Sequence, residues 1–305
     1  MIDLSMAEGF LSALVRVATP LLLAALGEML AERGGVINLG VEGAMLTGAL
    51  AAAIGASAAG PWAGLALAIV AGAVVAGGFA AVAIGARTDQ IITGTATTLA
   101  ALGLTGAVYR RAFGTSGAGL SLPTLSPLEL PGLADLPLVG PALFAQPVPT
   151  YLALLAVPVL WWFLFRTRAG LALRAVGESP ASARAAGVPV RQLQALATIA
   201  GGAFAGLAGG TLVLAQVGTF AERMTAGRGF IAIAIVVLGR WHPVGVLLAA
   251  LLFGGATALQ FLLQAAGLPV PYQLFLMLPH LLTLALLAGI AGGVRAPAAL
   301  GRTPE

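Results

Sequence analysis

The chain contains neither cysteine nor lysine, and each absence excludes a kind of chemistry. Without cysteine it can form no disulfide and has no thiolate for metal binding or nucleophilic attack. Without lysine it has no P-loop lysine, no Schiff-base lysine and no serine–lysine catalytic pair. All 15 basic residues are therefore arginine. Any ATP hydrolysis that drives this chain must take place in another protein.

Charge is also scarce. Charged residues make up 9% of the sequence, hydrophobic residues make up 59%, and the mean hydropathy is +1.01. A water-soluble domain of this length would not tolerate that composition. The net charge of +4 is too small and too dispersed for a nucleic-acid surface. The composition predicts an all-α, polytopic membrane protein with one transmembrane domain over residues 1–305.

Apolar stretches recur along the chain, and a membrane crossing needs about 20 apolar residues. We predict nine crossings, within a range of eight to ten, near residues 10–30, 37–59, 61–85, 91–112, 150–166, 192–216, 220–240, 243–265 and 272–292. The stretch at 220–240 is the weakest, because Glu222, Arg223 and Arg228 interrupt it. Its uninterrupted part spans roughly half a hydrocarbon core, so a half-helix is the alternative there.

Small residues recur every fourth position in three of these stretches. They are Gly40, Ala44, Gly48 and Ala52, then Ala73, Gly77, Ala81 and Gly85, then Gly202, Gly206 and Gly210. Such ridges let helices approach closely in a membrane. The alternative is that the pattern arises by chance, without a packing role, because the chain is rich in alanine and glycine.

Two connections differ in charge and predict the orientation. The connection at 167–191 and its flanking residue hold Arg166, Arg168, Arg174, Arg184 and Arg191. The connection at 114–149 holds no basic residue, and its charged residues are Glu129 and Asp135. The positive-inside rule makes the first cytoplasmic and the second external. The C-terminus, with Arg295 and Arg302, is then cytoplasmic and the N-terminus external. Arg110 and Arg111 fall on the external side and oppose this orientation.

The segment EMLAERGGVINLGVEG, residues 28–43, places charge between two apolar stretches. A charge at membrane depth costs at least about 2.5 kcal/mol, so such residues are expected to be functional or paired. Asn38 and Glu42 are four residues apart and share one face of a helix that starts before them. That face could present both polar side chains to a cavity. An ion pair between Glu42 and Arg33 is the structural alternative.

Other polar residues in apolar surroundings are weaker candidates. Gln260 and Gln264, with Tyr272 and Gln273 nearby, have the hydrogen-bonding groups that bind a sugar or a base, and interhelical contacts explain them equally well. His280 is interpreted as a helix-packing residue rather than a proton relay.

Two further assignments, a metal ligand and a helix cap, each depend on one residue. A single His242 is weak evidence for a metal, and we predict no metal site. Asp89 is interpreted as a helix-start residue.

The connection at 167–191 also contains a helix signature. Ser179 is a good N-cap, Pro180 suits the first helical position, Gly187 suits a left-handed cap, and Pro189 blocks continuation. These residues predict a helix at 180–186, roughly 10 Å long. It is either a docking element for another protein or an ordinary loop helix.

Three segments together resemble one protein family. They are LGEMLAERGGVINLGVEGAMLTGALAA, TDQIITGTATTLAALGLTGAVYR and LRAVGESPASARAAGVPVRQLQ, and YQLFLMLPHLLTLALLAG near the C-terminus also fits. They resemble permease subunits of bacterial ABC importers for nucleosides and simple sugars, over nearly the whole chain. ERGGVINLGVEG is closer to the nucleoside-type branch than to the ribose-type branch, which usually carries GIDLSVG.

The resemblance implies a plasma-membrane permease subunit that forms a pathway for nucleosides, or alternatively for a simple sugar. It also implies that Asn38 and Glu42 lie near this pathway. It implies three partners: a second permease, identical or related; an ATPase that binds ATP and Mg²⁺; and an extracytoplasmic binding protein. The chain itself is then no enzyme and holds no cofactor. The residues expected to dock on the ATPase are Gly177, Glu178, Ser179, Pro180, Ala181, Arg184, Ala185, Ala186 and Gly187.

Two other classes were weighed. An intramembrane hydrolase is disfavoured because no serine lies in a G-x-S-x-G turn. An ion-coupled secondary transporter stays open on the residues alone, because Glu28, Glu32, Arg33 and Glu42 are groups that can couple ions. Only the resemblance favours ATP.

Overall fold

The computed structural model describes residues 4–114, 121–265 and 295–302, with single positions 273, 274, 277, 281 and 285. Its elements in chain order are α1 (Leu4–Arg33), α2 (Val41–Ala59), α3 (Pro61–Ala80), the π-helical turn η1 (Ala81–Gly85), α4 (Gln90–Phe113), β1 (Leu128–Glu129), the π-helical turn η2 (Gly140–Phe144), β2 (Ala145–Gln146), α5 (Val148–Arg166), α6 (Arg168–Glu178), α7 (Pro180–Ala185), α8 (Val190–Thr211), the π-helical turn η3 (Leu212–Val217), α9 (Arg228–Leu238) and α10 (Pro243–Ala265).

Helices long and apolar enough to cross a membrane account for most of the described chain. There are seven in the described residues: Met6–Arg33, Val41–Ala59, Pro61–Gly85, Gln90–Phe113, Val148–Arg166, Val190–Val217 and Pro243–Gln264. They confirm the helical, polytopic class and seven of the predicted positions. In the stretch at 220–240 the helix is α9, whose 11 residues confirm the half-helix alternative. The crossing predicted at 272–292 lies outside the described residues, apart from single positions.

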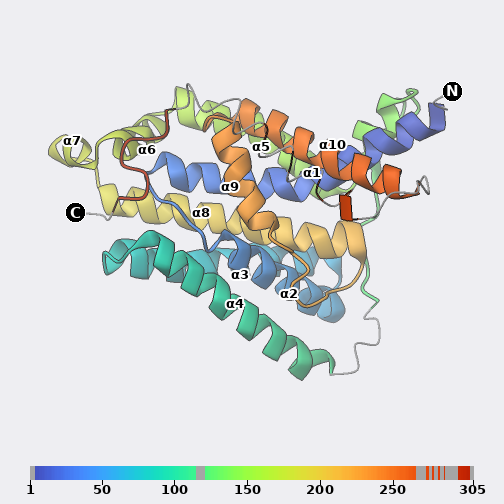
Figure 1. The fold of residues 1–305 in the computed structure, drawn as a ribbon, viewed down its shortest axis with the longest axis horizontal. Helices are drawn as coiled ribbons and strands as arrows, with labels where there is room; N and C mark the ends of the chain where they lie inside the picture. Colours follow the sequence, from blue (N-terminus) through green and yellow to red (C-terminus); the bar gives the residue numbers. More distant parts are fainter. Residues whose placement is uncertain are drawn as a thin grey trace.

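The helix α8 lies at the centre of the bundle and packs on α1, α2 and α3, while α10 packs along α1 (Figure 1). Gly48 and Gly206 confirm the predicted small-residue ridges of α2 and α8, because a Cβ on Gly48 would lie 2.5 Å from the Cα of Gly206. The ridge predicted for α3 was wrong. A Cβ at Gly77 would make only an ordinary contact, 3.9 Å from Ile199 Cγ1, whereas Gly72 makes the close contact, with its Cβ position 2.2 Å from the carbonyl oxygen of Gly202.

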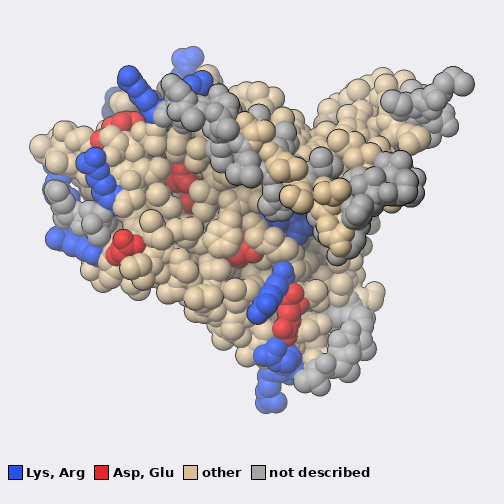
Figure 2. All heavy atoms as spheres, viewed as in Figure 1, with Lys and Arg blue, Asp and Glu red and all other residues tan. Residues whose placement is uncertain are grey.

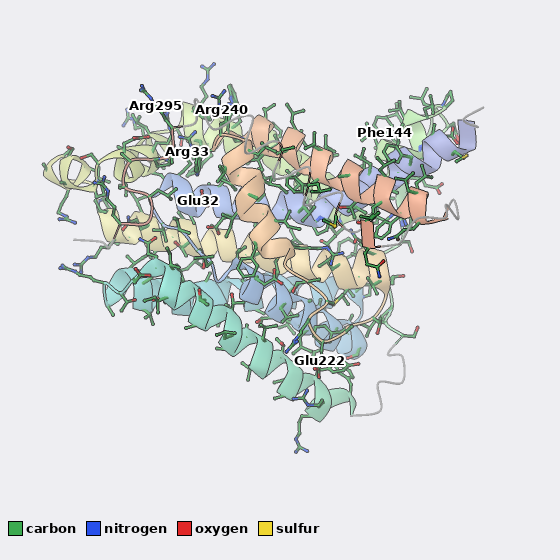
Figure 3. All side chains as sticks on the ribbon, viewed as in Figure 1. Glu32, Arg33, Phe144, Glu222, Arg240 and Arg295 are labelled. Carbon is green, nitrogen blue, oxygen red and sulfur yellow. The ribbon has the colours of Figure 1, made fainter. Side chains whose placement is uncertain are left out.

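The molecule has two chemically different ends. The N-terminus of α1 lies at one end, and α6, α7 and the C-terminal residues lie at the other (Figure 1). Arg33, Arg240 and Arg295 lie at the α6 end, whereas Phe144 and Glu222 lie at the opposite end (Figure 3). Arginine side chains gather at the α6–α7 end of the visible surface, and a second group of basic and acidic side chains lies over the far end of α4 (Figure 2).

The connection between α5 and α8 holds two helices. The sequence predicted only the second, α7. Its caps are confirmed: the Ser179 hydroxyl accepts a hydrogen bond from the Ser182 N–H at 3.3 Å, and Gly187 has φ +80°. The helix ends at Ala185, one residue earlier than predicted. The first helix, α6, was missed, although the hydroxyl of Thr167 caps its start.

One further local prediction holds, and the connection before α5 is also defined. Asp89 caps α4, with its Oδ1 accepting from the N–H of Ile92 at 2.9 Å. The connection before α5 lies along the end of the bundle instead of forming a separate domain, as the N–H of Leu125 donates to the carbonyl of Leu214 at 2.8 Å. A short antiparallel pair, β1 with β2, closes this connection.

Candidate functional site

The chain between α1 and α2, residues 34–40, forms no helix and is almost entirely buried. Helix α1 ends where the N–H of Gly34 donates to the carbonyl of Ala31 at 3.0 Å and Gly35 takes φ +84°. The chain then continues without helical hydrogen bonds until α2 begins at Val41. Non-helical backbone inside a membrane protein needs protein partners for every polar group, since lipid supplies none.

Side chains from α1, α4 and α8 supply those partners. The carboxylate of Glu28 accepts from the N–H of Asn38, and Gln90 Oε1 accepts from the N–H of Ile37, both at 2.8 Å. Thr98 Oγ1 donates to the carbonyl of Leu39 at 2.9 Å, and Gln194 Nε2 donates to the carbonyl of Gly34 at 3.0 Å. These side chains are buried. The break is therefore a built part of the fold.

Asn38 has a local role at the start of α2. Its side chain is 2% exposed, and its Oδ1 accepts from the N–H of Gly40 at 3.0 Å. Asparagine commonly binds its own backbone two residues on in this way. Asn38 thereby ends the non-helical segment, and its place in a substrate pathway stays a prediction.

Glu42 lies in the first turn of α2 and binds the first turn of α9. Its side chain is 5% exposed. Oε1 accepts from the Thr225 hydroxyl at 2.6 Å and from the Gly227 N–H at 2.9 Å, and Oε2 accepts from the Gly229 N–H at 2.7 Å. The carboxylate thus lies at the N-termini of two helices, where the helix dipoles stabilise negative charge.

The contact between α2 and α9 leaves no room for a side chain at Gly229. A Cβ at Gly229 would lie 2.6 Å from both the Cα and the N atom of Glu42. The half-helix α9 is therefore held against the start of α2 by close backbone packing and by the Glu42 carboxylate. This joint between α2 and α9 was not predicted from the sequence.

Arg33 does not pair with Glu42, so that structural alternative was wrong. Its Nε donates to the carbonyl of Trp241 at 2.8 Å, and its guanidinium lies 6.0 Å from the centre of the Phe165 ring. Glu32, beside it, accepts a hydrogen bond from the indole N–H of the same Trp241. The charged end of α1 therefore binds the turn between α9 and α10. Because α9 is also bound at Glu42, both ends of this half-helix are held by residues of the segment 28–43.

His242 follows Trp241 in that turn. Its ring centre lies 5.2 Å from that of Phe165. Burial lowers the pKa of His242 below its ordinary value, and the positive charge of Arg33 lowers it further. The imidazole is therefore neutral at neutral pH, as a ring packed beside an arginine should be.

The remaining pathway candidates lie elsewhere. Gln260 is buried and Gln264 is half-buried in the last turns of α10. Within the described residues, Asn38 and Glu42 form their hydrogen bonds with other groups. The assignment of the two glutamines stays a prediction. The side chain of Gln273 is exposed, and Tyr272 and His280 lie outside the described residues.

The proposed docking residues form an accessible surface around α7, with one exception. Among them, those at least partly exposed are Glu178, Ser179, Pro180, Ala181, Arg184, Ala185, Ala186 and Gly187. Ala183 anchors the helix by packing with Val176 and Val190. Gly177 is the exception: it is buried, and a Cβ there would lie 2.2 Å from the carbonyl oxygen of Arg33. Its place at a docking surface was wrong, because it packs α6 on the end of α1.

Comparison with known proteins gives the family. The family described as "Branched-chain amino acid transport system / permease component" matches residues 10–287. The chain is 44% identical over 270 residues to a putative glucose ABC transporter permease of Haloferax volcanii, covering 87% of this chain and 80% of that protein. No solved structure matches the chain.

Two nucleoside relatives align over more of the chain. A guanosine ABC transporter permease of Bacillus subtilis is 36% identical over 294 residues, covering 93% of this chain and 92% of that protein. A nucleoside ABC transporter permease of Lactococcus lactis is 32% identical over 294 residues with the same coverage. The resemblance inferred from the sequence is thus confirmed. The chain belongs to the family of branched-chain amino acid transport system permease components and is a membrane-spanning permease subunit of an ABC transporter.

Proposed function

We propose that this chain is one of two permease subunits of an ATP-driven importer that carries nucleosides across the bacterial plasma membrane. The observation that carries the proposal is the pair of nucleoside and guanosine permeases that align over 93% of this chain. In this assignment a partner ATPase binds ATP and Mg²⁺, and an extracytoplasmic protein delivers the substrate. The permease itself changes no covalent bond. It alternates between two states that nucleotide and binding protein stabilise differently.

The joint at Glu42 supports a pathway in this region. Interrupted helices with buried polar ends are common at the transport sites of membrane proteins. Here α2 and α9 start at one shared carboxylate, and the backbone before α2 is bound by side chains from three helices. We assign Glu42 to holding these helix starts together, with Asn38, Gln260 and Gln264 as candidate substrate contacts.

Competition separates the substrate classes. We expect cells that express the complete transporter to take up labelled guanosine, and excess uridine or adenosine to reduce that uptake while excess glucose leaves it unchanged. The matched control is the same strain without this permease. Guanosine uptake that does not depend on the permease would contradict the nucleoside assignment.

A simple sugar is the second candidate, supported by the 44% identity with the putative glucose permease. Labelled glucose uptake that depends on this permease, and that guanosine leaves unchanged, would establish the sugar assignment in place of the nucleoside one.

The proposed orientation puts α7 and the C-terminus in the cytoplasm. It is supported by the positive-inside rule, since the end with α6 and α7 carries the larger share of the arginines. Arg110 and Arg111 lie in the last turn of α4, at the other end, and count against this orientation, although Arg110 is held in an ion pair with Glu222 at 2.6 Å.

Orientation is testable because the chain has no native cysteine. Ser126 and Ser182 are both exposed. We expect Ser126→Cys to react with an impermeant maleimide in intact cells and Ser182→Cys to react only after permeabilisation. The control is the cysteine-free parent, which should stay unlabelled. Labelling of Ser182→Cys in intact cells would place α7 outside the cell and remove it from the ATPase.

Docking of the ATPase on α7 is expected to depend on the shape of that helix. Gly187 has φ +80° with open space around its Cβ position, so Gly187→Val strains the backbone without a clash, by about 1–2 kcal/mol. We expect it to reduce ATP-driven uptake at equal abundance in the membrane. The matched control is Ala186→Val, because Ala186 is exposed and has φ −80°. Equal loss in both variants would mean that bulk, and not the left-handed cap, is what matters.

A further inference from the structure

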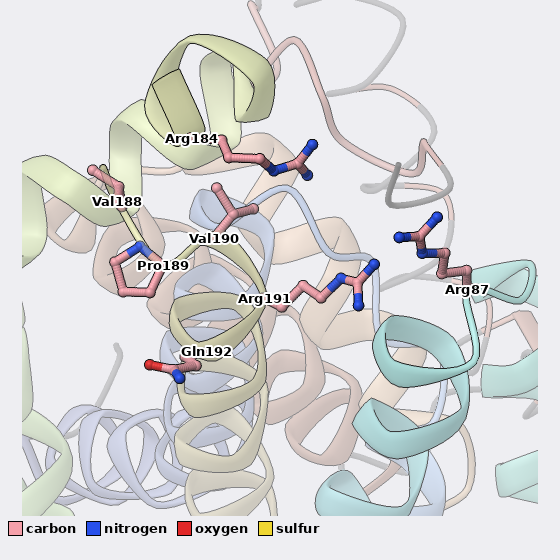
Figure 4. A pocket seen from close by; sticks show the side chains of 7 residues that line it. All are labelled: Arg87, Arg184, Val188, Pro189, Val190, Arg191 and Gln192. Atoms are coloured by element: carbon pink, nitrogen blue, oxygen red, sulfur yellow. The ribbon is translucent and has the colours of Figure 1, made fainter. Parts of the chain in front are cut away.

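Three arginines from separate elements surround one open cavity at the α7 end of the molecule. The cavity has a volume of about 480 Å³ and is lined by Arg87, Arg184, Val188, Pro189, Val190, Arg191 and Gln192. We call these residues the arginine groove. The guanidinium groups of Arg184, Arg191 and Arg87 extend toward the same space between α7, α8 and the turn before α4 (Figure 4).

The backbone fixes where these side chains start. Arg87 has φ +57°, a left-handed conformation that is uncommon for a residue with a side chain. The turn is held by Thr88, whose hydroxyl donates to the carbonyl of Val82 at 3.1 Å and lies 2.8 Å from the hydroxyl of Thr93. Arg191 lies in the first turn of α8, and Arg184 lies on α7. Strained backbone often marks a functional position.

A second cavity continues the groove along α7. It has a volume of about 190 Å³ and shares Arg184, Val190 and Arg191 with the first. Its other lining residues include Glu178, Ser179, Pro180, Ala181 and Arg302. The two cavities thus present four arginines and one glutamate, a clear excess of positive charge. Their combined extent, from the start of α7 to the turn before α4, fits an extended segment better than one small anion.

We propose that the arginine groove receives an acidic segment of the ATPase, so that the ATPase contact reaches beyond α7 to Arg87 on the turn before α4. This inference rests on the proposed function. Arginine binds carboxylates through paired N–H groups and holds them in a fixed geometry. Charge complementarity of this kind sets the register and the speed of docking.

The position of the groove favours a protein over a lipid headgroup. The second cavity is lined by Ser179, Pro180, Ala181 and Arg184, which are themselves part of the surface proposed to dock on the ATPase. A protein that covers α7 therefore also covers the groove, which leaves no access for a lipid from the side of α7. The acidic segment would lie between α7 and the start of α8.

Charge reversal tests the proposal in the assembled transporter. Arg87→Glu and Arg191→Glu change exposed residues of the groove, and Arg168→Glu changes an exposed arginine on α6 outside it. The readout is the amount of ATPase retained per permease as salt is raised during purification. We expect the two groove variants to release the ATPase at a salt concentration about threefold lower than the wild type. Fewer attractive charge pairs hold the ATPase in these variants, so less screening by salt is needed to release it. Arg168→Glu should behave as the wild type does.

A single-cysteine cross-link identifies the neighbour directly. Arg87→Cys can be coupled to a thiol-reactive photo-cross-linker, since the parent chain has no cysteine. We expect an adduct with the ATPase, identified by peptide sequencing. An adduct with phospholipid alone would overturn the proposal in favour of a lipid site.

The two levels of inference fail differently. A wild-type permease that retains no ATPase at any salt concentration would contradict the proposed function. A wild type that retains the ATPase, with Arg87→Glu and Arg191→Glu showing unchanged salt dependence, would overturn only the arginine groove.

Discussion

Replacing Glu42 with leucine is expected to abolish transport because the folded joint between α2 and α9 is lost. The substitution leaves the Thr225 hydroxyl and the N–H groups of Gly227 and Gly229 without their acceptor. Thr225 and Gly229 are buried and Gly227 is half-buried. Each buried donor left without a partner costs about 1–3 kcal/mol, so the expected loss of stability is at least about 2 kcal/mol. The measurements are thermal stability of the detergent-purified protein, ATPase copurification and uptake.

Glu42→Gln separates hydrogen bonding from charge. Glutamine keeps one acceptor oxygen, but its NH₂ group is a donor. That NH₂ group would face the N–H and hydroxyl donors that bind the carboxylate in the wild type. We therefore expect an intermediate loss of stability, about 1–3 kcal/mol, and partial uptake. Glu129→Gln is the matched control, because Glu129 is an exposed glutamate of β1 and should tolerate the change. Full transport by Glu42→Leu would contradict the role assigned to this carboxylate.

Gly72→Ala is expected to have the second large effect, through packing alone. Its new Cβ would lie 2.2 Å from the carbonyl oxygen of Gly202, so α3 and α8 must separate. Overpacking of this kind typically costs about 1–3 kcal/mol, and the contact lies between two central helices. We expect lower thermal stability and lower abundance in the membrane.

Gly78→Ala provides the control within the same helix. A Cβ at Gly78 meets nothing within 4 Å, so the only effect is on the backbone. Alanine is favoured over glycine inside a helix by roughly 0.5–1 kcal/mol, so Gly78→Ala should be neutral or slightly stabilising. Equal behaviour of the two variants would mean that α3 and α8 do not pack as closely as described.

The sequence was sufficient for the fold class because apolar length is a local property. Each of the seven long helices lies at a predicted crossing. The helix caps at Asp89, Ser179 and Gly187 were also predicted from the sequence. A capping side chain or a left-handed glycine interacts with backbone only a few residues away, so its signal is local. Helix α6 was missed although its 11 residues are amphipathic and Thr167 caps its start, because the proline and glycine that bound α7 are more conspicuous in the sequence.

Hydrogen-bond partners that lie far apart in the sequence could not be predicted from the local sequence pattern. The contact of Glu42 with Gly229 joins residues 187 positions apart, and nothing in the local pattern of either segment predicts it. The sequence indicates that the Glu42 charge needs a function or a partner, but the partner considered as the structural alternative was the nearby Arg33 and not the start of a distant helix. The signal that was available lay in Gln90, Thr98 and Gln194, which are polar residues within apolar helices and proved to bind the break before α2.

The ridge predicted for α3 failed for a related reason. Alanine and glycine occur so often there that two registers of small residues were available, and only the position of α8 selects Gly72 over Gly77. Gly177 was placed at the docking surface by the family resemblance, whereas its lack of a side chain permits the close contact with Arg33.

The energy source of uptake tests the central claim most directly. Labelled guanosine uptake would be measured in cells that depend on this permease, once with an ionophore that collapses ion gradients while ATP is maintained, and once with ATP depleted while the gradients are maintained. An ATP-driven permease subunit predicts that uptake continues with the ionophore and stops without ATP. Uptake that stops with the ionophore and continues without ATP would contradict it and would establish ion coupling.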